Sequence, residues 1–465
     1  MWSLLSSLEI GRKSLAAQQA GLQVVSNNIA NVNTPGYTRE RAVLEPSLPE
    51  PTTAGQIGTG VDVRTVESAR DQFLEIRISQ ASQNTGKQDA IVGYLSQIES
   101  TFSASDHGLQ DGISRFFNSF STLAGDPTSS SLRYGVVSAA QNMAAMFRSA
   151  AQQLTDVRDN ANTAVAASVG EINGLTSTIA QLNQQIVSAE IDGTEASTLR
   201  DQRSVAINQL SKSLDIHYYE TEDGSVSVST GAGQPLVTAG FAETLNAESS
   251  PPNGFYEVRV GTNDITSSIQ GGRLGGLLDV RDRLVPAYQA DLDTLAESII
   301  SQVNSVQATG TDLQVPPTSP AVNLFNPAAT VAGAAASFSV NPAVVADARY
   351  LAAGQSGAPG DNANAIDFGD LASKKVLAGG TQSFSEAFSS LQFKVGTDQQ
   401  NATKQLDTEN ALLTQLNNSR DSVSGVSLDE EAIDLMRFQR AYQAASKFIT
   451  VIDQLTQDLI QSFSA

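Results

Sequence analysis

Two apolar seams, one at each end of the chain, constrain the fold of this sequence more than any other feature. Near the C-terminus apolar residues recur mainly at three- and four-residue intervals, and they include Phe438, Tyr442, Ile449, Ile452 and Leu459. Near the N-terminus four apolar residues stand seven positions apart, namely Leu8, Leu15, Leu22 and Ile29. Such spacing places one apolar stripe along a helix, and the stripe needs a partner helix to cover it. The sequence therefore predicts two long terminal helices that meet in space.

These terminal helices are predicted to take part in assembly. Ordering each residue costs about 1–2 kcal/mol of backbone entropy, and a single narrow seam returns too little to order both helices fully. We therefore expect the pair to become fully ordered only against neighbouring copies or a partner. The nine seam residues named above would then form an assembly interface. The spacing alone leaves one alternative open, which is an ordinary two-helix base of a monomer.

Composition limits the classes of partner. The chain has 465 residues, enough for two or three domains, and a formal net charge of −21. This charge argues against nucleic acid and against an anionic membrane surface as partners. No run of apolar residues is long enough to span a membrane, and the N-terminus lacks the pattern of a secretory signal peptide. There are no cysteines, so disulfides and thiolate chemistry are excluded.

The middle of the chain alternates long helical patterns with one short β-rich stretch. The fold class predicted is mainly α, with a long antiparallel helical bundle or coiled coil formed by the two halves of the chain. A small β-rich module is inserted between the halves, at the far end of the helices. The predicted domains are a terminal coiled-coil domain from 1–65 and 421–465, a long-helix domain from 66–214 and 271–420, the β module at 215–270, and a loop-rich insertion at 309–362.

The sequence offers little for catalysis or metal binding. Its two histidines, His107 and His217, stand in no metal-ligand spacing, and no nucleophile motif accompanies them. The glycine-rich run at 271–276 lacks a phosphate-binding pattern and indicates a close approach of two backbones instead. Acidic residues at 430, 431 and 434 are interpreted as favourable charges in the first turns of the last helix. We predict no enzyme activity, no cofactor and no metal.

A polar turn motif follows the first helix. The stretch from Ser26 to Tyr37 reads SNNIANVNTPGY, and Asn28, Asn31, Thr34, Pro35, Gly36 and Tyr37 are its candidate functional residues. Pro35 and Gly36 fit the two central positions of a type II turn, in which glycine accepts a positive φ. This turn is predicted to set where the first helix stops.

The same stretch resembles the N-terminal signature of bacterial flagellar axial proteins, the family of rod, hook and hook-associated subunits. The C-terminal stretch SGVSLDEE at 424–431, with FQRAY at 438–442 and ITVID at 449–453, is similar to the matching end of that family. The helical middle resembles the hook-associated members in particular, in segments near 173–183, 201–203, 271–278 and 360–362. The likeness covers nearly the whole chain.

The resemblance implies a structural adaptor at the hook–filament junction, exported by the flagellar type III apparatus and located outside the cell. It further implies a ring of identical subunits, with hook protein on one side and a second junction protein on the other. An export chaperone would bind the C-terminal helix. The chain is short for this family, so 309–362 would be a reduced outer domain. Two alternatives stay open, which are another axial subunit such as a hook or distal rod protein, and an exported enzyme or binding protein that uses the β module.

Overall fold

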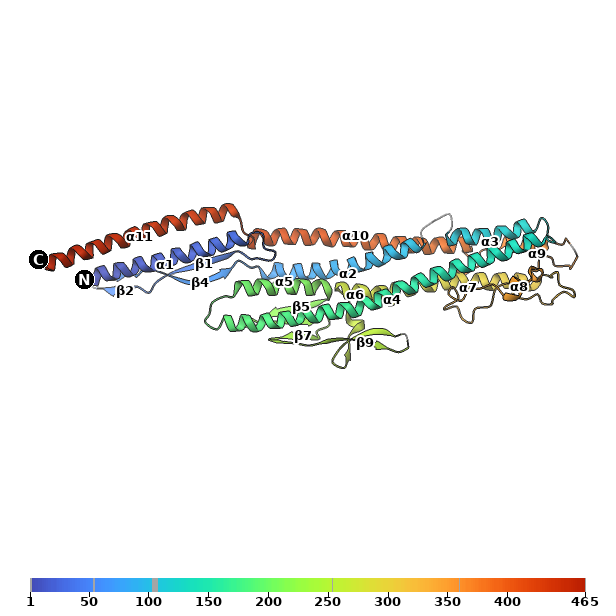
Figure 1. Ribbon diagram of the computed structural model, residues 1–465, viewed down its shortest axis with the longest axis horizontal. Coiled ribbons are helices and arrows are strands. Elements are labelled where there is room, and N and C mark those ends of the chain that lie inside the picture. The colour runs from blue at the N-terminus through green and yellow to red at the C-terminus, as the bar shows by residue number, and fades with distance from the viewer. Residues whose placement is uncertain (1, 53–54, 103–107, 253, 359, 465) are drawn as a thin grey trace.

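The molecule is a long rod in which both chain ends lie at the same extremity (Figure 1). The computed structural model describes residues 2–52, 55–102, 108–252, 254–358 and 360–464. The helices are α1 (Trp2–Asn31), α2 (Gln72–Phe102), α3 (Leu109–Leu123), α4 (Ser130–Ala189), α5 (Ser197–Ser213), α6 (Gly272–Asp279), α7 (Val285–Thr309), α8 (Pro342–Ala346), α9 (Ala363–Asp370), α10 (Phe384–Ser424) and α11 (Leu428–Ser464). The mainly α fold class with a small β-rich central region is confirmed.

Two short hairpins follow α1, and two small sheets follow α5. The strands are β1 (Glu40–Pro46), β2 (Glu50–Thr52), β3 (Gly55–Ile57), β4 (Val61–Ser68), β5 (Ile216–Glu220), β6 (Val226–Thr230), β7 (Pro235–Thr238), β8 (Phe241–Ala242), β9 (Leu245–Ser250), β10 (Phe255–Val260) and β11 (Asn263–Asp264). β1 pairs with β4, and β2 pairs with β3 at the tip of the same ribbon. The two later sheets are antiparallel, with strand orders β5-β6-β7-β8 and β11-β10-β9.

The chain runs along the rod four times. α2 leads outward to α3 at the outer end, and α4 returns toward the chain ends over 60 residues. After α5 and the sheets, α6 and α7 lead outward again, and α10 returns beside α2 (Figure 1). The long helical pattern of the middle of the chain is present, because α4 is continuous over 60 residues from its cap at Ser129. Ser129 accepts the backbone N–H of Leu132 through its hydroxyl, as an N-cap residue does.

The position predicted for the β module is wrong. The sheets formed by β5–β11 lie beside the C-terminal half of α4, near the middle of the rod and not at its far end (Figure 1). The module begins with a hairpin, since β5 and β6 pair around Gly224, whose φ is +81°. Asn183 of α4 anchors the module because its side chain exchanges hydrogen bonds with both the N–H and the C=O of Val226. The periodicity of a helix does not show where along its length an inserted sheet will pack. The position of the β module could therefore not be predicted from the sequence.

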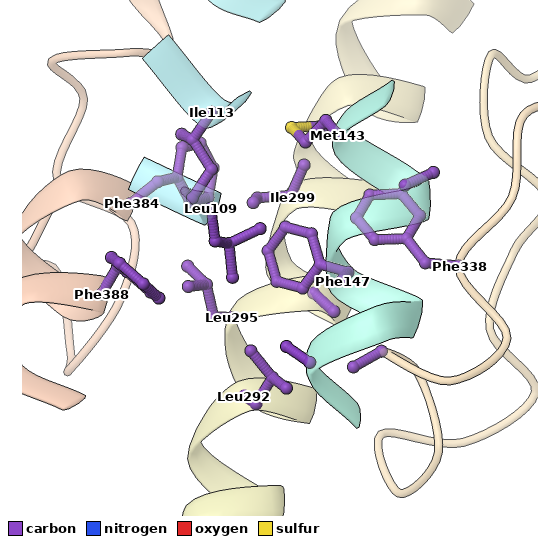
Figure 2. Packing of buried hydrophobic residues seen from close by; sticks show 14 of the residues in the cluster. Leu109, Ile113, Met143, Phe147, Leu292, Leu295, Ile299, Phe338, Phe384 and Phe388 are labelled. Atoms are coloured by element: carbon purple, nitrogen blue, oxygen red, sulfur yellow. The ribbon is translucent and has the colours of Figure 1, made fainter. Parts of the chain in front are cut away.

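The outer half of the rod has a continuous aromatic core. Figure 2 shows Phe147 of α4 surrounded by Leu295 and Ile299 of α7, by Leu109 of α3 and by Phe338 of the loop before α8. Phe384 and Phe388 of α10 close the other side. Residues 309–362 contribute Phe325 and Phe338 to this same core, so the segment has no separate core among its described residues. Burial of such side chains stabilises a fold by about 1.5–3 kcal/mol each.

A second core holds the inner part of the rod together. The C-terminal half of α4 packs against α5, α6 and the sheets, with Ile172, Ile179, Leu210 and Leu274 fully or almost fully buried. The glycine run at 271–276 brings backbones together as predicted. A Cβ at Gly276 would lie 2.5 Å from the carbonyl oxygen of Lys87 in α2. This contact fixes α6 against α2 and leads the chain directly into α7.

Candidate assembly site at the chain ends

The inner extremity of the rod is a layered structure of two helices and a ribbon. α1 and α11 run antiparallel and lie side by side, as the sequence predicted for the two ends (Figure 1). The ribbon formed by β1 and β4 packs against α1 on the side away from α11. Lys13 of α1 ties the ribbon down through an ion pair of 3.0 Å with Asp62. The order of layers is therefore α11, α1 and ribbon.

Two glycines of α1 allow the helices to approach closely. A Cβ at Gly11 would lie 2.6 Å from Cγ1 of Ile449, and a Cβ at Gly21 would lie 2.5 Å from a ring carbon of Phe438. Ala17, Val24 and Val25 are also buried along α1. The predicted interface missed these glycines. Their presence inside a helix, where each costs about 1 kcal/mol relative to alanine, was the signal that could have identified them.

The predicted seam residues occupy different environments. Ile452 is buried, whereas Phe438, Ile449 and Leu459 are half-buried and Tyr442 is exposed by 38%. On α1, Leu8, Leu15, Leu22 and Ile29 are all half-buried. The structure thus brings both seams into one layer, and the most deeply buried positions of α1 are small residues instead of the leucines. Their role in contacts with other copies stays a prediction.

A second apolar stripe of α11 faces away from α1. It consists of Ile433, Met436, Val451 and Leu455, with Phe448 at its edge beside Gly11 of α1, and all five are between 42% and 61% exposed. At 100° per residue the stripe lies roughly a third of a turn around the helix from the side that contacts α1. The three basic residues of α11, namely Arg437, Arg440 and Lys447, lie on the same side. We call this surface the α11 free face.

The turn motif is built around Asn28, which is almost fully buried. Its Oδ1 accepts hydrogen bonds from the hydroxyl of Tyr37 at 2.8 Å and from the N–H of Glu40 at 3.0 Å. Its Nδ2 donates to the C=O of Glu40 and to the carboxylate of Glu431 on α11. The turn itself is as predicted, because Tyr37 N–H donates to Thr34 C=O and Gly36 has φ +82°.

The other two members of the motif, Asn31 and Pro35, lie within the turn itself. Asn31 ends α1, and its Nδ2 donates to the C=O of Asn27, one helical turn earlier. Its Oδ1 accepts a hydrogen bond from the hydroxyl of Thr34, while Pro35 is exposed. These contacts hold the turn but reach no other element. Asn28 is therefore the member of the motif that connects the two chain ends.

An ion-pair cluster links this turn to the start of α11, and it gives Glu430, Glu431 and Asp434 a role beyond that of favourable charges in the first turns of the helix. Arg39 lies 2.6 Å from Glu430 Oε2 and 2.6 Å from Glu431 Oε1, and 3.8 Å from Asp434. Glu431 is only 1% exposed. Burial lowers the pKa of Arg39, but its hydrogen bonds and the charges of both glutamates raise it further, so the net shift is upward and Arg39 stays charged.

Asp201 of α5 joins the terminal layer to the rest of the rod. Its carboxylate accepts hydrogen bonds from the N–H of Thr38 at 2.8 Å and from the hydroxyl of Thr38 at 2.7 Å. Arg70, just before α2, pairs with the same carboxylate at 2.6 Å. Burial raises the pKa of Asp201, while these partners oppose the shift. Neighbouring residues 36, 38 and 39 thus contact three separate elements, α5 through Val205 and Asp201, and α10 and α11 through Arg39.

The structure offers no metal-binding constellation in the part of the chain that it describes. Among these residues no group of three or more His, Asp or Glu side chains could hold a metal ion. His217 is exposed on β5, and His107 lies outside the described residues. Within the same ranges, no helix has the length and apolar character required to cross a bilayer.

Comparisons with known proteins identify the family. Residues 95–325 match the profile of the flagellar hook-associated protein FlgK helical domain. Residues 8–38 match the flagella basal body rod protein profile, and 419–462 match the C-terminal profile of flagellar basal body rod FlgEFG proteins. Flagellar hook-associated protein 1 of Bacillus subtilis is 29% identical, over 99% of this chain and 98% of its own length. Over nearly its whole length the chain is similar to flagellar hook-associated protein 1.

Further comparisons agree with the family. Flagellar hook-associated protein 1 of Escherichia coli is 25% identical over 99% of this chain and 100% of its own length. The solved structure of the flagellar hook junction protein FlgK from Burkholderia pseudomallei shares the fold, with a TM-score of 0.67 and 18% identity over 75% of this chain and 100% of that chain. The match of the helical middle separates the hook-associated family from rod proteins, because the two rod-protein profiles match only at the ends of the chain. The chain is a flagellar hook-associated structural protein.

Proposed function

We propose that this chain is a non-enzymatic adaptor subunit that joins hook to filament and assembles through its terminal layer. The single observation that carries the proposal is the α11 free face. A lone copy leaves Ile433, Met436, Phe448, Val451 and Leu455 in contact with water, although α11 is already paired with α1. A contiguous apolar stripe of this size on an otherwise acidic protein marks an interaction surface. Neighbouring subunits of an axial structure would cover it.

The partners in this proposal are those that the resemblance to the hook-associated proteins implies. Identical subunits would form a ring, with hook protein below and the second hook–filament junction protein above. Before assembly an export chaperone would cover the C-terminal helix, and the flagellar type III apparatus would carry the chain out of the cell. In this proposal Leu8, Leu15, Leu22 and Ile29 join Phe438, Tyr442, Ile449, Ile452 and Leu459 as the assembly interface. The turn from Asn28 to Tyr37 keeps α1 and α11 in register.

The test exchanges exposed apolar residues of the free face for acids. Val451→Asp with Leu455→Asp leaves the buried side of α11 unchanged, so the helical circular dichroism and the monomer mass should stay as in the wild type. We expect cells that carry this variant to make hooks without filaments and to release filament protein into the medium. Ile366→Asp on α9 is the matched control, since Ile366 is 48% exposed but lies at the outer end of the rod. Normal filaments in the double variant would refute the proposal.

A truncation gives a second measurement. Removal of residues 436–465 takes away most of α11 but none of the two large cores, which lie in α2–α10 and the sheets. We expect the shortened chain to remain folded and soluble and to fail in joining hook to filament. Normal incorporation of the truncated chain into flagella would contradict the assignment of assembly to α11.

A further inference from the structure

The terminal layer has a second uncovered face, on the ribbon. Leu44 of β1 and Val63 of β4 stand opposite each other in the ladder, and both are exposed. Toward the tip, Leu48 is 89% exposed and Ile57 is 55% exposed. We call these four residues the ribbon outer face. It points away from α1, because the opposite side of the ribbon packs on that helix through contacts such as Lys13 with Asp62.

The two uncovered faces carry opposite charges. On the ribbon outer face the acidic residue is Glu50, which stands opposite Ile57 in the ladder. Glu45 stands opposite Asp62 and shares the side of the ribbon that packs on α1. Residues 435–452 of α11 contain three basic residues, Arg437, Arg440 and Lys447, and no acidic residue. Within the described parts of the chain, Glu50, Arg440 and Lys447 have no ion-pair partner. Unpaired acidic charge on one apolar face and unpaired basic charge on the other favour contact between the two faces.

The faces also agree in length. From Ala42 to Thr52 the outgoing arm of the ribbon spans about 33 Å if it is extended at about 3.3 Å per residue. From Ile433 to Leu455 the free face spans about 33 Å at 1.5 Å per residue. Both run along the axis of the terminal layer (Figure 1). They cannot meet within one copy, because α1 lies between the ribbon and α11.

We infer that the ribbon outer face of one copy packs on the α11 free face of a second copy of this chain. The inference rests on the proposed assembly through the terminal layer and names the two surfaces that meet. Leu48 and Ile57 lie against the apolar stripe of α11, and Glu50 pairs with Arg440 or Lys447. Because the two surfaces differ, the contact is heterologous, so each copy offers one of each and the contact repeats around a ring or along a helix.

Disulfide trapping tests the contact in assembled flagella. The chain has no cysteine, so each introduced thiol is unique. Leu48→Cys and Phe448→Cys chains are co-expressed, flagella are isolated and oxidised, and dimers are separated on a non-reducing gel. We expect a dimer from the mixture and none from either variant alone, and the double variant should give a ladder of multimers. Leu48→Cys with Val315→Cys is the control, because Val315 is 94% exposed but belongs to the loop between α7 and α8, two helices that lie in the outer half of the rod (Figure 1).

The possible results separate this inference from the proposed function. If chains are incorporated and filaments attach but only single variants form dimers, like faces meet and the inference is wrong. If incorporated chains give no dimer in any combination, the inference is also wrong, while the proposed function stands. If the wild-type chain is absent from isolated hooks and filaments, the proposed function itself fails.

Charge reversal supplies an independent measurement that does not depend on thiols. Glu50→Lys, and separately Arg440→Glu with Lys447→Glu, should each lower the amount of chain incorporated per flagellum at least tenfold. The triple variant that combines these reversals should recover incorporation to within about threefold of wild type. A triple variant no better than Glu50→Lys or the α11 pair alone would overturn the inference. All three positions are exposed on the terminal layer, so helical circular dichroism should stay unchanged in each variant.

Discussion

Removal of Arg39 should release α11 from the turn motif. Arg39 lies within 2.6 Å of both Glu430 and Glu431, and Glu431 is 1% exposed. In Arg39→Met the Glu431 carboxylate would keep only the hydrogen bond from Asn28, at 3.1 Å. Removing one partner of a buried ion pair costs about 3–5 kcal/mol, and we take the lower value because Arg39 and Glu430 are partly in contact with solvent. The expected cost is therefore about 3 kcal/mol for docking of α11.

Trypsin measures this docking directly. Arg437, Arg440 and Lys447 are cleavage sites on α11, and cleavage requires the helix to open locally. A loss of about 3 kcal/mol corresponds to roughly 150-fold faster cleavage when opening and closing are fast. The fragments are identified by mass spectrometry. Cleavage within the large cores of the rod should stay slow, because those cores do not contact Arg39.

Two variants decide whether the stranded charge is the cause. Arg39→Met combined with Glu431→Gln leaves a neutral amide that still accepts from Asn28, so most of the protection should return. Arg420→Met is the matched control, since Arg420 pairs only with its sequence neighbour Asp421 among the described residues, and a surface pair contributes about 0–1 kcal/mol. Wild-type cleavage rates in Arg39→Met, or no rescue by Glu431→Gln, would refute the reasoning.

Three further predictions concern packing and pH. Gly21→Ala should weaken α11 docking by about 1–2 kcal/mol in the trypsin assay, because its Cβ would lie within 2.7 Å of three ring atoms of Phe438. Gly170→Ala, with open space at its Cβ, should instead stabilise α4 by about 0.5–1 kcal/mol. A change of stability in the same direction in both variants would contradict this account. Phe147→Ala should lower the free energy of unfolding of the rod by about 3–5 kcal/mol in urea, because Phe147 is 0% exposed. A loss below about 1 kcal/mol would contradict the packing of Phe147 in the core that Figure 2 shows. Hydrogen bonds from the Thr221 and Ser225 hydroxyls and from the Ser225 N–H lower the pKa of Asp223 to about 2, and backbone N–H groups lower the pKa of Asp361. The stabilisation that these two carboxylates contribute is complete above about pH 4 and is lost as the pH falls toward 2. The thermal midpoint should therefore fall across that window, and it should fall less in Asp361→Asn.

The helices were predictable because positions that are buried once per helical turn require apolar residues at regular intervals in the sequence. α4 shows this best, since its buried positions recur without interruption from Val136 to Ile186. The turn after α1 was equally accessible, because Pro35 and Gly36 restrict the backbone to few conformations. Both features depend on neighbours a few positions apart. Local chemistry was sufficient for them.

The contacts between distant segments were not predictable. Arg39 and Glu430 are 391 positions apart, and nothing in either local pattern indicates the other. The acids at the start of α11 were therefore interpreted as helix-dipole partners, which explains their position in the helix but not the burial of Glu431. Likewise, a heptad pattern favours leucines as the contact residues, whereas the close approach of α1 and α11 depends on Gly11 and Gly21.

The uninterrupted length of α4 has a mechanical consequence. A helix of 60 residues is about 90 Å long, and its inner end is seated beside α5, which holds Thr38 through Asp201. A tilt of only about 5° at that seat would displace the far tip of the helix by about 8 Å for a lever of this length. Small differences in the orientation of α4 between copies therefore become large displacements at the outer end of the rod. The same subunit can then contact a curved and a straight axial structure with little internal rearrangement.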